Sequence, residues 1–90
     1  MDKYGFIAFY EEKGYYPSGF VEGMAKCLVD FEKAIDEDLD FYADDPFEIL
    51  NKYRFSEKEG DSDIEYSIFA YIAYLEKRQA SQNYTKDRKD

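Results

Sequence analysis

The side chains of this chain that could do chemistry are mostly carboxylates, and they are concentrated in one stretch. Seven acids and no base stand in the thirteen residues of DEDLDFYADDPFE, residues 36–48. Asp36, Asp38 and Asp40 have the one-three-five spacing that opens an EF-hand calcium loop. Such a loop needs glycine at its sixth position and a bidentate glutamate at its twelfth, and this chain has phenylalanine at both. The sequence therefore predicts no calcium site, and we assign no metal ligand and no cofactor.

Other catalytic chemistry finds little support. The chain has no histidine, the commonest general base near neutral pH. Its one cysteine, Cys27, falls within an apolar stripe, where a thiol behaves as a small hydrophobic side chain. There is no glycine-rich phosphate loop, and a carboxylate pair of the glycosidase type needs a deep cleft that 90 residues rarely build. We expect that the protein is not an enzyme.

The negative charge is unevenly placed along the chain. The net charge is −9, and the window from Asp30 to Glu65 holds fourteen acids against four bases. The rest of the chain holds seven acids and eight bases. An acidic field of this kind repels nucleic-acid phosphates and anionic lipid and attracts basic protein surfaces. We expect a basic protein partner, with no direct binding to nucleic acid or membrane.

Length and composition predict one folded domain. Ninety residues with 44% apolar and 20% aromatic content can bury a small core, unlike an acidic disordered tail. A lone cysteine excludes an internal disulfide. The first residues lack the pattern of a signal peptide, and no run approaches the roughly 20 apolar residues of a membrane span. These features predict a cytoplasmic protein.

The first half of the chain predicts two helices. Asp2 is placed to cap a helix over Lys3–Lys13 that stops at Gly14, although the aromatic residues 4–10 also suit a short edge strand. A turn follows, with Ser18 as the N-cap of a second helix. Its apolar residues recur at three- and four-residue steps: Phe20, Met24, Cys27, Leu28, Phe31 and Ile35.

The second half predicts two more helices. Asp45, Pro46 and Glu48 form an N-cap, a first-turn proline and a capping-box glutamate, for a short helix that reaches about Tyr53. Ser62 opens a long final helix that ends near residue 81. We therefore predict an all-α fold, a compact bundle of four helices with a short third one, in a domain of residues 1–80. Residues 81–90 form a polar tail that we expect to be mobile.

The last helix has apolar residues on nearly every side, which leaves two interpretations. Ile64, Ile68, Tyr71, Ile72 and Leu75 make the expected core stripe. The other side carries Tyr66, Phe69, Ala70, Ala73 and Tyr74. Either the helix is central in its own domain, or this second face supports a structural or regulatory homo-oligomer such as a homodimer.

The acids would form a regular row if the second helix continued past Ile35. Glu32, Asp36 and Asp40 would then stack at four-residue spacing, where like charges destabilise a helix. One such step rises about 6 Å, close to two phosphate steps of a DNA strand. Carboxylates at that repeat could replace phosphates, as in a DNA mimic. The alternative is a solvated surface that serves solubility alone.

One short segment of the sequence resembles segments of two known families. The segment YYPSGFVEGMAKCL, residues 15–28, resembles the turn and helix of barstar-like ribonuclease inhibitors and is similar to YYP and SPSGI elements of colicin immunity proteins. The remaining pattern departs from both families, so no functional residue is carried over. In general type the chain is similar to nuclease immunity proteins, antitoxins and phage-encoded inhibitors of restriction or CRISPR nucleases.

We therefore predict an inhibitor that occludes the nucleic-acid-binding surface of a basic partner, such as a nuclease. Acids would supply long-range attraction and aromatic side chains would supply desolvated contacts. The predicted partner-binding residues are Glu32, Asp36, Glu37, Asp38, Asp40, Tyr42, Asp44, Asp45, Glu48, Tyr53 and Phe55.

Overall fold

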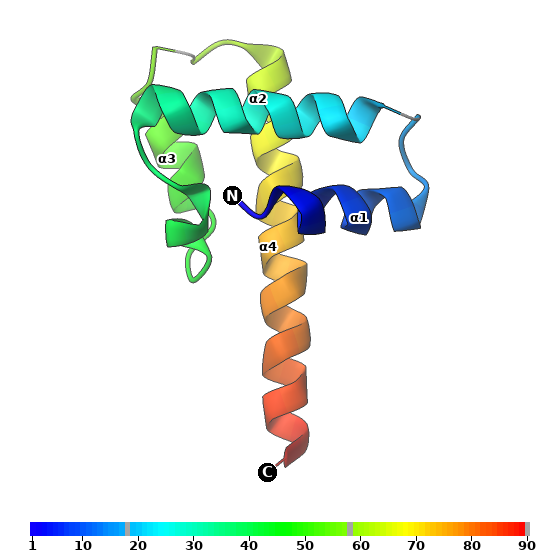
Figure 1. The fold of residues 1–90 in the computed structure, drawn as a ribbon. Helices are drawn as coiled ribbons and strands as arrows, with labels where there is room; N and C mark the ends of the chain where they lie inside the picture. Colours follow the sequence, from blue (N-terminus) through cyan, green and yellow to red (C-terminus); the bar gives the residue numbers. More distant parts are fainter. Residues whose placement is uncertain (18, 58, 90) are drawn as a thin grey trace.

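The computed structural model describes the backbone of residues 1–17, 19–57 and 59–89 and the side chains of these residues as far as residue 80. Within them the chain forms no strand (Figure 1). The α-helices are α1 (Lys3–Lys13), α2 (Phe20–Ile35), α3 (Glu48–Arg54) and α4 (Ser62–Lys89), and η1 (Leu39–Tyr42) is a 3₁₀-helix. The predicted all-α fold of four helices with a short third one is confirmed, and the alternative of an N-terminal strand is wrong.

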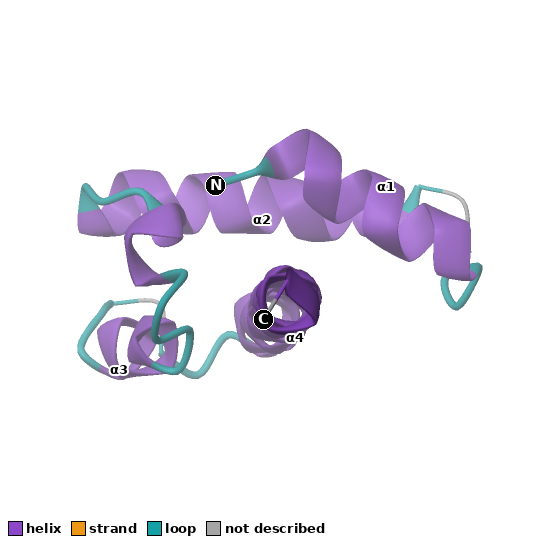
Figure 2. Ribbon diagram, turned by 90° about the horizontal axis from the view of Figure 1, so that it is seen from below, coloured by secondary structure: helices purple, strands orange, loops and turns teal. Residues whose placement is uncertain are grey.

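The other helices pack around the first half of α4. α1 and α2 lie side by side and cross α4 (Figure 1). α3 lies beside the first turns of α4. Seen along α4, the α1–α2 layer covers one side of that helix and α3 an adjacent side (Figure 2). The second half of α4 extends beyond its neighbours (Figure 1).

This arrangement explains the apolar residues all round α4. Side chains from both predicted faces are buried, namely Ile64, Ile68, Ala70, Tyr71, Ile72, Tyr74 and Leu75. The interpretation of this helix as central in its domain is confirmed.

α1 approaches α4 closely, and a glycine makes the approach possible. Phe6 is fully buried, and the hydroxyl of Tyr10 donates a 2.7 Å hydrogen bond to the Ala70 carbonyl. A Cβ atom at Gly5 would overlap the Asp2 carboxylate and the Tyr74 hydroxyl. The predicted ends of α1 are confirmed, because the Asp2 side chain accepts from the Gly5 amide and Gly14 adopts a left-handed conformation.

The buried stripe of α2 is turned slightly from the predicted one. Val21 and Ala25 are buried, whereas Phe20 is 44% exposed and Cys27 only partly buried. The packing of α1 and α4 against α2 decides this orientation. The predicted N-cap, Ser18, lies outside the described residues, and the helix begins after Gly19, whose φ is 84°.

α3 begins later than predicted. The Glu48 amide donates to the Asp45 carbonyl at 3.0 Å and the Ile49 amide to the Pro46 carbonyl at 3.1 Å. These three-residue steps form a tight turn ahead of the helix, which has no side-chain cap. The predicted Asp45 cap is therefore wrong.

The cap of α4 stands one residue earlier than predicted. A side-chain oxygen of Asp61 accepts from the Asp63 amide at 3.0 Å and from the Ile64 amide at 3.4 Å. This bonding makes Asp61 the N-cap in place of Ser62. The helix also continues to Lys89, beyond the predicted end near residue 81. The mobility predicted for residues 81–90 stays a prediction, because their side chains lie outside the described residues.

Candidate protein-binding surface

The segment of residues 36–48, here the acidic lobe, has a defined backbone between α2 and α3. Asp36 ends α2 in a left-handed conformation with a φ of 55°. The Asp38 carboxylate accepts a 2.9 Å hydrogen bond from the Asp40 amide and so opens η1. Leu39 is fully buried and fastens the segment to the core. The lobe is thus an ordered loop and not a continuation of the helix.

Most carboxylates of the acidic lobe face solvent. The exposed ones are Asp36, Asp38, Asp44, Asp45 and Glu48. In the part of the chain that the structure describes, no lysine or arginine forms an ion pair with Asp36, Asp44 or Asp45. Phe41 and Phe47 of the same segment are 77% and 53% exposed. The lobe therefore presents uncompensated negative charge together with apolar surface.

Two predicted binding acids serve the fold instead. Glu32 accepts from the Met1 amino group at 2.6 Å and from the Leu39 amide at 2.7 Å. Asp40 accepts a hydrogen bond from the buried Tyr71 hydroxyl. The predicted helical row of Glu32, Asp36 and Asp40 is wrong, because the left-handed Asp36 breaks the helix between them.

Glu37 and Tyr42 are engaged with each other at the edge of the lobe. The Tyr42 hydroxyl donates to the Glu37 carboxylate, which also lies 2.9 Å from the Lys52 ammonium. The hydrogen bond from Tyr42 and the pairing with Lys52 lower the pKa of Glu37. The hydrogen bond from the Met1 amino group likewise lowers the pKa of Asp38. Both carboxylates remain ionised into the acidic range.

The structure separates the two aromatic residues predicted after the lobe. Tyr53 is buried, and its hydroxyl donates to the Asp61 carbonyl at 3.2 Å and accepts from the Gly60 amide at 2.8 Å. It fastens the loop before α4, so its predicted contact with a partner is wrong. Phe55 is 91% exposed and remains available.

Sequence reasoning missed Phe41 and Phe47 as surface residues. Both were considered only as failed calcium positions. Each has an acid on one side only, Asp40 before Phe41 and Glu48 after Phe47. Leu39 has acids on both sides and is nevertheless fully buried, so the local sequence does not distinguish exposed from buried apolar residues in this segment.

The predicted oligomer face is divided by packing within the chain. Ala70 and Tyr74 are buried, and the Tyr74 ring lies 5.3 Å from the Phe9 ring of α1. Tyr66 and Phe69 remain about half exposed. α1 therefore covers part of this face, whereas Tyr66, Phe69 and Ala73 stay exposed. The homo-oligomer stays a prediction.

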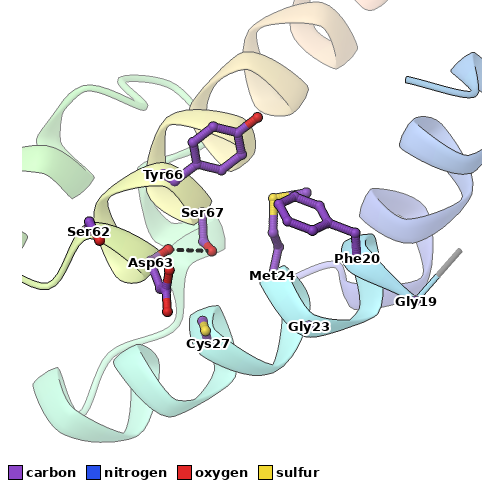
Figure 3. A pocket seen from close by; sticks show the side chains of 9 residues that line it. All are labelled: Gly19, Phe20, Gly23, Met24, Cys27, Ser62, Asp63, Tyr66 and Ser67. Atoms are coloured by element: carbon purple, nitrogen blue, oxygen red, sulfur yellow. Dashed lines mark hydrogen bonds between the residues drawn. The ribbon is translucent and has the colours of Figure 1, made fainter. Parts of the chain in front are cut away.

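A groove of about 560 Å³ lies between the first turns of α2 and α4 (Figure 3). We call it the α2–α4 groove. Its lining includes Phe20, Gly23, Met24, Cys27, Asp63 and Tyr66. Burial and the nearby carboxylates of Asp63, Asp61 and Asp30 raise the pKa of the Cys27 thiol. The thiol is therefore protonated near neutral pH and poorly suited to nucleophilic attack.

The described residues contain no group of three or more metal-ligating side chains. No helix among them has both the length and the apolar character required to cross a bilayer. Comparison of the chain with protein-family models, with curated proteins and with solved structures gave no match.

Proposed function

We propose that the protein binds a basic protein through the acidic lobe and blocks that partner's nucleic-acid-binding surface. The observation that supports this function most is the set of exposed, uncompensated carboxylates on one ordered segment. Phe41 and Phe47 lie on the same segment and add apolar contact area.

The mechanism follows from the placement of charge. A field of one sign accelerates encounter with an oppositely charged surface, and desolvated aromatic contacts then slow dissociation. The carboxylates would occupy positions that phosphates take in the partner's own complex. Because these carboxylates stand on an irregular loop, they would imitate the charge of the phosphates and not their regular spacing. Partners of the restriction, CRISPR or toxin nuclease type have the required basic surface.

The first test is a matched pair of charge variants. The lobe variant carries Asp36→Asn, Asp44→Asn, Asp45→Asn and Glu48→Gln, and leaves Asp38 in place because its carboxylate is paired with the Met1 amino group. The control carries four exposed neutralisations outside the lobe, namely Glu11→Gln, Glu12→Gln, Glu57→Gln and Glu76→Gln. The wild-type chain first captures its partner from the organism that encodes it, and mass spectrometry identifies that partner. Isothermal titration calorimetry then compares the three chains.

We expect the lobe variant to bind about a hundredfold more weakly, equivalent to about 2.7 kcal/mol. The control should stay within about threefold of wild type, because distant exposed charges are screened at physiological salt. Added wild-type chain should also compete with nucleic acid for the partner. Equal losses in both variants would show that total charge matters and the lobe does not.

A further inference from the structure

The α2–α4 groove contains a glycine that the free chain does not require. Gly23 lies in the interior of α2, where glycine destabilises a helix relative to alanine. Its φ is not positive, and a Cβ atom there would meet nothing within 4 Å. Gly5 of α1 is the contrast, since a Cβ there would overlap Asp2 and Tyr74. The effect of Gly23 is to keep the floor of the groove open.

The walls of the groove are held in place before anything binds. The Phe20 ring is stacked on Tyr16 at 5.1 Å and meets the Tyr66 ring edge-on at 6.0 Å. The hydroxyl of Tyr66 donates a 3.1 Å hydrogen bond to that of Tyr16. Phe20 and Tyr66 nevertheless remain 44% and 48% exposed. Exposed apolar walls that are already ordered lose little entropy on binding.

The negative charge of the groove favours an occupant of positive charge. Asp63 is the one charged residue among the described residues that line it (Figure 3). Asp61 and Asp30 are close enough to act on the Cys27 thiol in the same region. A second copy of this chain would bring a net charge of −9 to an acidic surface, so self-association is opposed.

We infer that the α2–α4 groove receives an apolar side chain of a basic protein segment, placed over Gly23, with a neighbouring cationic side chain against Asp63. This inference rests on the proposed function only for the positive charge of the partner. It adds a second contact site, remote along α2 from the acidic lobe, that recognises apolar shape as well as charge.

The test uses two short synthetic peptides as probes. One is an amphipathic peptide of leucine and arginine, and the other has every leucine replaced by glutamine at the same charge. Each is titrated into the ¹⁵N-labelled chain while amide signals are followed by NMR. We expect the leucine peptide to shift the amides of Gly23, Cys27 and Ser67, and the glutamine peptide to leave them in place.

Variants then assign the site. Gly23→Met fills the floor and should weaken binding of the leucine peptide about tenfold or more, and Asp63→Asn should weaken it several-fold. Gly23→Ala adds a single methyl group, favours the helix and should have an intermediate effect. Ala8→Met, on the exposed side of α1, is the control and should bind as wild type does. Circular dichroism confirms that each variant keeps its helices.

The outcomes separate this inference from the proposed function. If both peptides bind with equal affinity, or if Gly23→Met binds as wild type does, the groove does not recognise an apolar anchor and the inference is overturned. The acidic lobe would still be tested independently, by the affinity of the lobe variant for the captured partner. Loss of leucine-peptide binding in Gly23→Met but not in Ala8→Met supports the groove even if the lobe variant keeps full affinity for that partner.

Discussion

At the residue scale, tyrosine hydroxyls connect the start of the chain to α4. The hydroxyl of Tyr74 donates to Asp2 at 2.6 Å, and that of Tyr71 accepts from the Asp2 amide at 2.9 Å. Arg78 lies 3.2 Å from the same Asp2 carboxylate. The pKa of Tyr71 is raised by its burial and by the hydrogen bond that its hydroxyl donates to Asp40. These tyrosines therefore stay protonated and act as donors to carboxylates.

Asp2 should make the stability of the protein depend on pH. The hydrogen bond from Tyr74, the Gly5 amide and the charge of Arg78 lower the pKa of Asp2. A folded-state pKa below the unfolded one contributes stability at neutral pH that is lost as pH falls through the folded pKa. We expect Asp2→Asn, which retains an N-cap side chain, to flatten the decline of the urea midpoint below about pH 4.

The control for this pH dependence is Asp44→Asn, which removes the same charge from the exposed lobe without removing a described hydrogen bond. An Asp2→Asn profile parallel to that of wild type would contradict the assignment to Asp2.

At the element scale, the sequence predicted helices better than their ends. The three- and four-residue steps identified α2, and Asp2 with Gly14 bounded α1 correctly. The predicted start of α3 was wrong by two residues, because a tight turn precedes that helix and no side chain caps it. The predicted cap of α4 was wrong by one residue, because Asp61 and Ser62 are both good caps. Only three-dimensional packing decides among such residues.

The candidate site could be predicted from the sequence only in part. The concentration of acids in residues 36–48 is a local property, and the structure places most of them at the surface. The roles of Glu32 and Asp40 were not readable, because their partners include residues about thirty positions away in the sequence. A contact between residues so far apart in the sequence produces no periodic pattern of residue types.

The cap of α4 gives a direct test at this scale. Asp61→Ala removes the acceptor for the Asp63 and Ile64 amides, and we expect the free energy of unfolding to fall by about 1 kcal/mol. Ser62→Ala, at the next residue, should change it by less than about 0.5 kcal/mol. Urea denaturation followed by circular dichroism measures both, and a larger loss in Ser62→Ala would restore the cap originally predicted.

At the scale of the whole molecule, the packing of α1 across α4 predicts a monomer. Because Tyr74 is buried within the chain, we expect Tyr74→Asp to lower the free energy of unfolding by about 3 kcal/mol or more, through the loss of the packed ring and the burial of a second carboxylate near Asp2. Phe69→Asp, at a half-exposed position of α4, should be far milder. Sedimentation of the wild-type protein should give one mass at all concentrations. A dimer that Tyr74→Asp converts into a folded monomer would favour the homo-oligomer.

The tie between Asp40 and Tyr71 has a consequence for biosynthesis. The two residues are separated by 31 positions, and domains acquire their structure progressively as the ribosome delivers the chain. Until α4 emerges from the exit tunnel, η1 lacks the hydroxyl that fixes its carboxylate. A nascent chain arrested before that point would display the anions without their final arrangement, so the binding proposed for the acidic lobe would arise only after Tyr71 of α4 has reached Asp40.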